Sequence, residues 1–354
     1  EFANLLVGRL KGGLAHVNVV ASIIFSGMSG SALADAAGPG KLEVDMMVKA
    51  GYSPGFSAAL STTSAIIGPI IPPSIPMVLY GLVSSTSIGY LFIGGVIPGL
   101  LLGFAQMGVI VFLARTRNFP VEPRPTLPQA VRTVRLASPA LLLPAIMLGG
   151  IYSGAVTPTE AAAVAAAYAL LLAVGFYRTL NFGRLVQVLV DSARSTAVVA
   201  ITIAGALVMN WVVAAEQLPE ALGQWMQALD LSPTMFLLMV NVLFLVLGCF
   251  LDTLLMLLVI VPILMPTVTA LGIDPVHFGV VAVVNMMIGL VTPPMGELLF
   301  LISGVSGIEL HLIMKELWIF LIVLIILLFV LVLVPELTLW LPIQMGYQPV
   351  GSLR

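Results

Sequence analysis

The sequence predicts an all-α polytopic membrane protein, from its low charge, its recurrent apolar stretches and a repeated Pro-Pro pattern. Hydrophobic residues make up 60% of the 354 residues and charged residues only 8%. A soluble domain carries about 25% charged residues, so lipid must be the solvent for most of this chain. Stretches of about 20 apolar residues, the length that crosses a bilayer, recur throughout. We expect spans at 55–86, 91–113, 137–156, 160–177, 196–215, 276–304 and 316–334.

The charge balance and the residue counts exclude several other classes. The net charge of −2 provides no basic stripe for nucleic acid, so no nucleic-acid partner is expected. The single cysteine, Cys249, excludes an internal disulfide and a Cys-based metal cluster, and the three histidines lie far apart in sequence. The sequence contains no HExxH or Walker motif, and no enzymatic activity is expected.

Basic residues predict the orientation, because loops rich in Lys and Arg stay in the cytoplasm. The clearest cluster, which we place in the cytoplasm, consists of Arg115, Arg117, Arg124, Arg132 and Arg135. The loops at 152–160 and 216–230 contain no basic residue and are expected outside. With these spans, only Arg354 of the 14 basic residues falls outside, so the C-terminus is predicted to be periplasmic.

Two stretches predict re-entrant hairpins rather than simple spans. Residues 14–30 are apolar, but 32–50 carry five charged side chains, too many to cross lipid. Backbone that turns back at membrane depth is tolerated only where protein or a water-filled cavity surrounds it. The second candidate is 234–270, with its turn at 248–252. Both of its arms are apolar, so two full spans are an alternative there.

A pattern of five Gly and Pro positions occurs twice in the chain. Gly51-Tyr-Ser-Pro54 and Gly272-Ile-Asp-Pro275 both open the pattern G-x2-P-x13-G-x3-P-P, at an offset of 221 residues. The pattern ends at Pro72-Pro73 and at Pro293-Pro294. Four predicted crossings separate the two copies, and the 234–270 stretch adds no net crossing, so the copies run in opposite directions. Inverted repeats of this kind are widespread in secondary transporters.

Each Pro-Pro pair is expected to break its helix in mid-membrane, because adjacent prolines remove two backbone donors and clash with the preceding turn. The break frees carbonyl groups, which suit Na⁺, and exposes a half-helix N-terminus, which suits an anion. Both breaks are flanked by hydroxyl or amide side chains, which hard cations favour: Ser64, Ser74, Asn285 and Thr292. A plain proline kink in a packing helix is the alternative, and two breaks at matching positions favour a site.

The motifs around these breaks resemble those of one transporter family. The motifs are Gly68-Pro-Ile-Ile-Pro-Pro-Ser74, Phe25-Ser-Gly-Met-Ser-Gly-Ser-Ala-Leu-Ala-Asp35 and Gly289-Leu-Val-Thr-Pro-Pro-Met-Gly296. They are similar to the large membrane subunit of TRAP transporters, and the resemblance covers nearly the whole chain. That family pattern begins with further membrane helices, and this chain opens on Glu1, so we expect a fragment.

The resemblance implies uptake of a small organic acid (a carboxylate) across the bacterial inner membrane, driven by a Na⁺ gradient. The implied fold is an elevator, in which a transport domain slides against a scaffold. Expected partners are a periplasmic substrate-binding protein and a small membrane subunit, separate or fused. The implied domains are a connecting segment (1–13), two transport halves (14–86 and 234–304), scaffold and connecting helices (87–233), and a final scaffold helix with an outer tail (305–354).

The resemblance also implies two sites, each made of one hairpin tip and one helix break. The first Na⁺ site would comprise Ser29, Gly30, Ser31, Ser64, Gly68 and Pro72, and the second Gly248, Asp252, Thr253, Asn285, Gly289 and Pro293. The substrate would lie between them, near Ser31, Ser74, Thr292, Gly296 and Glu297. At Glu297 the family is expected to carry a less charged residue, so the substrate need not match that of common members.

Two other functions are compatible with the sequence. A stand-alone Na⁺/carboxylate symporter of similar fold would need no binding protein. An ion channel would also use re-entrant loops, although an inverted repeat argues against a symmetric pore. An intramembrane enzyme would need paired catalytic groups such as GxGD or HExxH, and the sequence has neither.

Overall fold

The structure, a computed structural model, describes residues 1–117, 119–120, 126–217 and 232–350. Arg124, Arg354 and most of the predicted outer loop, 218–230, lie outside the described residues. All regular elements within the described residues are helices. Six are long and apolar enough to cross a membrane: α7 (Ile88–Thr116), α8 (Leu127–Tyr152), α9 with η2 (Pro158–Phe176), α10 (Phe182–Ala215), α13 with η3 and α14 (Thr253–Ala270), and α17 (Leu310–Leu333). The prediction of an all-α multi-span membrane protein is confirmed.

The other helices are shorter, and several begin at one local sequence pattern. They are α1 (Phe2–Val7), α2 (Gly13–Ser29), α3 (Ala32–Asp35), η1 (Ala36–Gly40), α4 (Lys41–Lys49), α5 (Pro54–Ala65), α6 (Ile75–Ser84), α12 (Pro233–Gly248), α15 (Pro275–Gly289), α16 (Glu297–Ser306) and α18 (Glu336–Gln344). Ser53, Ser232 and Asp274 each cap a helix whose first residue is proline. Such a cap satisfies a free backbone N–H, and proline costs nothing at the first position. Ser53 lies in a G-x-S-x-G pattern, but its hydroxyl accepts a hydrogen bond from Phe56 N as a helix cap.

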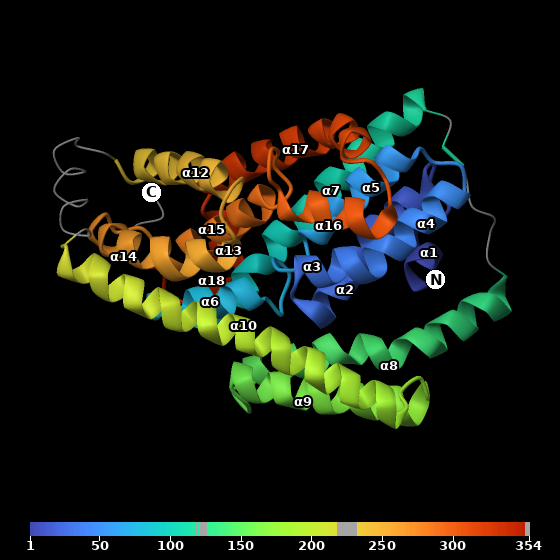
Figure 1. Ribbon diagram of the computed structural model, residues 1–354, viewed down its shortest axis with the longest axis horizontal. Helices are drawn as coiled ribbons and strands as arrows, with labels where there is room; N and C mark the ends of the chain where they lie inside the picture. Colours follow the sequence, from blue (N-terminus) through green and yellow to red (C-terminus); the bar gives the residue numbers. More distant parts are fainter. Residues whose placement is uncertain (118, 121–125, 218–231, 351–354) are drawn as a thin grey trace.

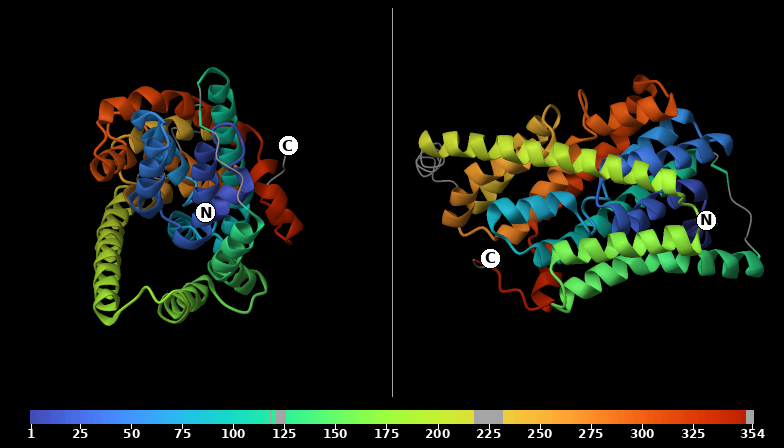
Figure 2. Two further views of the ribbon diagram at one scale, coloured as in Figure 1. Left: turned by 90° about the vertical axis from the view of Figure 1, so that its right-hand side faces the viewer. Right: turned by 60° about the horizontal axis from the view of Figure 1, so that its bottom comes forward.

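The helices form a packed body with three long helices beside it (Figure 1). Within the body, α15 is buried along nearly its whole length, whereas α8, α9 and α10 each bury only two side chains. Figure 2 shows α8, α9 and α10 along one side of the body. The predicted scaffold and connecting region, 87–233, therefore divides. Helix α7 packs in the body against α2, α15 and α17, and the other three helices lie outside it.

Helix α17 is the predicted scaffold helix at the C-terminal end. It packs against α5, α7 and α15, with a buried face that includes Phe320, Leu324 and Leu328. Its opposite face, which includes Trp318 and Ile322, is exposed. The helix thus packs with the two predicted transport halves. Its uniformly aliphatic sequence concealed this, because protein and lipid are equally apolar neighbours.

The two broken helices lie side by side and antiparallel. Helix α6 packs on α15, and α5 packs on α16. The Tyr80 hydroxyl, in α6, donates to the Pro275 carbonyl at the start of α15, with an O···O distance of 2.7 Å. The end of the first broken helix therefore meets the start of the second. This arrangement is expected if the two helices cross the membrane in opposite directions.

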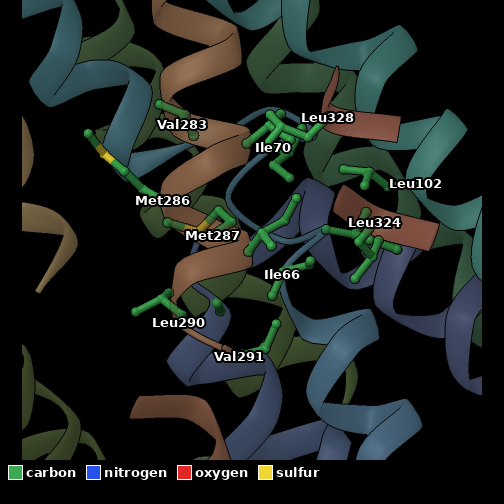
Figure 3. Close-up of a cluster of buried hydrophobic side chains, with 14 of the residues drawn as sticks. Ile66, Ile70, Leu102, Val283, Met286, Met287, Leu290, Val291, Leu324 and Leu328 are labelled. Carbon is green, nitrogen blue, oxygen red and sulfur yellow. The ribbon is translucent and has the colours of Figure 1, made fainter. Parts of the chain in front are cut away.

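The breaks are embedded in the apolar core. Ile66 and Ile70, which belong to the first break, point into a cluster with Leu102, Val283 and Leu324 (Figure 3). Both isoleucines are fully buried. The cluster joins α7, α15 and α17 to the non-helical segment, so close packing holds these unwound residues in place.

An ion pair of 2.8 Å between Arg117 and Glu316 joins the end of α7 to the start of α17. Away from it, the Tyr347 hydroxyl donates to Asp274 Oδ2 at 2.9 Å and ties the C-terminal tail to the start of α15. Each contact joins two segments that the distribution of basic residues places on the same side of the membrane. The periplasmic position of the C-terminus stays a prediction.

Candidate functional site

The first predicted hairpin tip lies directly against the first break. Helix α2 ends at Ser29, and Gly30 follows with φ +62°, a left-handed conformation that glycine adopts at little cost. The Ile75 N–H donates to the Gly30 carbonyl at 3.4 Å. A Cβ at Gly30 would lie 2.5 Å from the Pro73 carbonyl oxygen, so only glycine allows this approach.

The first break extends from the end of α5 at Ala65 to the start of α6 at Ile75. Ser74 caps α6 by accepting from Met77 N at 3.2 Å, and its hydroxyl donates to the Pro69 carbonyl. A Cβ at Gly68 would lie 3.5 Å from the Ser31 carbonyl oxygen. Pro72, within this break, is buried. The structure therefore brings Gly30, Ser31, Gly68 and Ser74 into one neighbourhood.

The side chains of the first tip are used locally. Ser29 Oγ accepts from Ser31 N at 3.4 Å, and Ser31 Oγ caps α3 by accepting from Ala34 N at 3.3 Å. Ser64 lies one helical turn before Gly68, where its hydroxyl donates to Asn18 Oδ1 at 2.7 Å. Ser64 is thus held on the α2 side of the break, by a residue that the sequence analysis did not single out.

The second tip and the second break meet at two glycines. Helix α12 ends at Gly248 and α15 ends at Gly289. A Cβ at Gly289 would lie 2.9 Å from Gly248 Cα, so the two backbones are in direct contact. Asp252 caps α13 by accepting from Leu254 N at 3.1 Å, and the next residue, Thr253, is buried.

The second break is a compact loop between Gly289 and Glu297. The Thr292 hydroxyl donates to the Ile288 carbonyl at 2.7 Å. Gly296 folds back on the loop, since a Cβ there would lie 2.7 Å from the Leu290 carbonyl oxygen. Pro293 is half-buried in this loop, and Glu297 begins α16 with an exposed side chain. The carboxylate of Glu297 lies near that of Asp252, and the two repel each other.

The two tip-and-break pairs adjoin each other across the body. Helix α3, after the first tip, contacts α16, and α13 with η3, after the second tip, contacts α6. Each hairpin therefore touches the broken helix of the other half. Among the described residues no hydrogen bond links Ser31 or Ser74 to Thr292 or Glu297, so the predicted substrate residues belong to two facing groups.

A cavity of about 560 Å³ separates the first tip from the outlying helices. Ser29, Gly30 and Ser74 line its inner wall. Met147 of α8 and Ala165 of α9 line the opposite wall. The cavity thus lies between the packed body and the helices beside it.

Two buried asparagines complete the surroundings of the breaks. Asn18 of α2 bonds to Ser64, and Asn241 of α12 accepts from Asn285 Nδ2 at 2.8 Å. Asn285 Oδ1 and Thr253 Oγ1 are buried oxygen atoms without a hydrogen-bond partner. An amide in the middle of an apolar helix was the only available clue to Asn18 and Asn241, because no local pattern identifies their partners.

Comparison with known proteins identifies the family. A family model described as tripartite ATP-independent periplasmic transporter, DctM component, matches residues 1–337. The chain belongs to this family. The motif resemblance is confirmed, and the TRAP large-permease homologues are transporter subunits, not enzymes.

Relatives of this TRAP permease cover most of its length. The chain is 45% identical over 348 residues to the sialic acid TRAP transporter large permease SiaM of Vibrio cholerae, covering 98% of the chain and 82% of the relative. It is 42% identical to the C4-dicarboxylate large permease DctM of Pseudomonas aeruginosa, covering 98% of the chain and 81% of the relative. It is 39% identical to the isethionate permease DctMQ of Oleidesulfovibrio alaskensis, covering 88% of the chain and 49% of that longer protein.

Proposed function

We propose that this chain is the large permease of a bacterial inner-membrane TRAP system that imports a small organic acid by Na⁺ symport. The observation that carries the proposal is the pair of tip-and-break contacts, Gly30 against Pro73 and Gly248 against Gly289. Relatives named for sialic acid, C4-dicarboxylates and isethionate support an acidic substrate. The inner membrane follows from the six apolar spans and the bacterial relatives.

Sodium suits the donor atoms around the breaks. Na⁺ is cargo here, and as a hard cation it takes carbonyl, hydroxyl and amide oxygens. Asn285 Oδ1 and Thr253 Oγ1 are buried oxygens with unused lone pairs beside the second break. The described residues contain no group of three His, Cys, Asp or Glu side chains that could hold a metal, so the oxygen donors of the breaks are the best-supported ligands.

The substrate anion would bind between the two facing groups of residues. Helix α6 starts at Ser74 and α16 starts after Gly296, and the N-terminus of each half-helix carries partial positive charge. Ser31 and Thr292 add hydroxyl oxygens on the two sides. Glu297 offsets part of the positive potential of α16, which favours a substrate of low negative charge over a multiply charged one.

Alternating access would follow from motion of the body against α8, α9 and α10. The apolar cavity between the first tip and Met147 of α8 leaves few polar contacts to break during such a slide. The antiparallel broken helices and the 221-residue offset between Gly68 and Gly289 support an inverted repeat with two re-entrant hairpins. A periplasmic binding protein would deliver the acid, and a small membrane subunit, separate or fused, would pair with the permease.

Uptake by proteoliposomes tests the proposal. The permease is reconstituted with the small subunit, and uptake of sialic acid, succinate and isethionate is measured with an inward Na⁺ gradient or with K⁺ in its place. Na⁺-driven uptake that needs the binding protein is expected. Uptake without the binding protein would indicate a stand-alone symporter, and Na⁺ currents without solute would indicate a channel.

A further inference from the structure

Two asparagines, one in each half, connect a hairpin to its broken helix. Asn18 lies on α2 and is 1% exposed, and Asn241 lies on α12 and is 2% exposed. A buried amide needs hydrogen-bond partners, because burial without them carries the full cost of removing the group from water. Both find their partners on a helix that leads into a break, four residues before its glycine.

In the second half the hydrogen bonds form a directed chain. Asn241 Nδ2 donates to the Leu237 carbonyl at 2.7 Å, which fixes the amide so that Asn241 Oδ1 faces α15. Asn285 Nδ2 donates to Asn241 Oδ1 and to the Asn241 carbonyl, both at 2.8 Å. Both hydrogens of the Asn285 amide are therefore used. Its Oδ1 is buried and accepts nothing.

In the first half the series of hydrogen bonds runs in the same direction, from the hairpin asparagine to the broken helix, but uses different side chains. Asn18 Nδ2 donates to Ser61 Oγ, which orients the amide, and Asn18 Oδ1 accepts from the Ser64 hydroxyl at 2.7 Å. A hydroxyl has one hydrogen and two lone pairs. The Ser64 oxygen also lies 3.2 Å from the Ser61 carbonyl, and the shorter contact to Asn18 is the one that takes its single hydrogen. Ser64 then presents lone pairs to any further partner.

Ser64 and Asn285 occupy the same place in the two copies of the repeat. The offset of 221 residues that relates Gly68 to Gly289 also relates Ser64 to Asn285. In α15, Asn285 and Gly289 lie on one face, because residues four apart share a helix face. Ser64 lies in the last turn of α5, four residues before Gly68, which belongs to the break. In both halves the donor hydrogens of this residue are consumed by an asparagine of the neighbouring hairpin helix.

We propose that Asn18 and Asn241 are positioning residues for the transported cations. They turn Ser64 and Asn285 so that oxygen lone pairs, and no N–H or O–H groups, face the ions at the two breaks. A free amide could present its NH₂ end instead, which would repel a cation. The inference rests on the proposed Na⁺ coupling and assigns the orienting groups of both sites.

The test compares Asn241→Leu and Asn18→Leu with Gln106→Leu. Leucine has the same branching at Cγ as asparagine and replaces the amide with two methyl groups. Gln106 is a buried amide that donates to the Thr63 carbonyl of α5 at 2.9 Å and takes no part in either chain, so it is the matched control. Two quantities are measured on the purified full chain: the Na⁺ concentration at half-maximal rise in Tm, and the Tm without Na⁺.

Asn241→Leu and Asn18→Leu should each raise the half-maximal Na⁺ concentration about tenfold, as is typical when the partner of a metal ligand is removed. Gln106→Leu should lower Tm without moving that concentration. Asn285→Asp presents oxygen in either orientation, so adding Asn241→Leu to it should raise the concentration less than about twofold. If Asn241→Leu does not fold, Asn241→Ala, which keeps only the backbone acceptor, takes its place.

The outcomes separate this inference from the function on which it rests. A wild-type chain that responds to Na⁺, with both asparagine variants unchanged in half-maximal Na⁺ concentration, overturns the positioning role alone. An equal tenfold rise in the Gln106→Leu variant also overturns it, because the effect would then be structural. A wild-type chain without any Na⁺ response, compared with K⁺, overturns the proposed Na⁺ coupling itself.

Discussion

The two halves of the molecule share a backbone arrangement and differ in side-chain chemistry. In the first half the tip is a left-handed glycine, Gly30, against Pro73, the side chains of the tip are hydroxyls, and a buried carboxylate, Asp35, follows at the end of α3. In the second half Gly248 and Gly289 bring two backbones together, and Asp252 and Glu297 add two carboxylates. The difference indicates that the repeat maintains the breaks, whereas the side chains around them have diverged.

Restoring a continuous helix at the first break should have the largest effect, because only the second half would then keep its break. Pro72→Ala with Pro73→Ala supplies the missing backbone donors and lets α5 run toward α6. Na⁺-driven uptake should fall roughly 100-fold, because the site geometry is lost. Membrane insertion, followed by yield and detergent solubility, should be largely retained. Normal Na⁺-dependent uptake by this variant would show that the first break is only a packing kink.

Closing the glycine contact should damage the second half alone. Gly289→Ala places a Cβ 2.9 Å from Gly248 Cα, so one backbone must move. We expect a loss of about 1–3 kcal/mol in stability, measured as a lower Tm, together with weaker Na⁺ binding. Gly108→Ala in α7, where a Cβ meets nothing within 4 Å, is the control and should not lower Tm. Equal behaviour of the two variants would argue against the contact.

Removing the Asp252 carboxylate leaves the second tip helix capped by a neutral side chain, as Ser31 caps the first. Asp252→Asn keeps the helix cap, since asparagine caps as well as aspartate, and removes only the charge. The half-maximal Na⁺ concentration for uptake should rise about tenfold. An unchanged Na⁺ titration would assign Asp252 to capping alone.

The smallest effect is expected at Glu297. Its side chain is exposed, so water screens its interaction with Asp252 and with any bound ion. Glu297→Gln should change the half-maximal Na⁺ concentration less than about twofold. The same variant should improve uptake of a dicarboxylate relative to a monocarboxylate, in competition assays. No change in that ratio would remove Glu297 from the substrate site.

The sequence predicted the features that depend on local chemistry. The helix breaks followed from Pro72-Pro73 and Pro293-Pro294. The two tip-and-break groupings came from family resemblance, since nothing local links Gly248 to Gly289. Asn18 and Asn241 were missed because a single amide in an apolar helix does not reveal its partner. The packing of α17 on both predicted transport halves could not be predicted, because aliphatic composition does not distinguish a protein neighbour from lipid.

The most direct test of the two-site account is the ratio of Na⁺ to substrate taken up by proteoliposomes, measured with two radiolabels in the presence of the binding protein. Two tip-and-break sites predict at least two Na⁺ ions per substrate, and a lower ratio in the Pro72→Ala, Pro73→Ala variant where residual uptake can be measured. A wild-type ratio of one or less would contradict the claim that both breaks bind Na⁺.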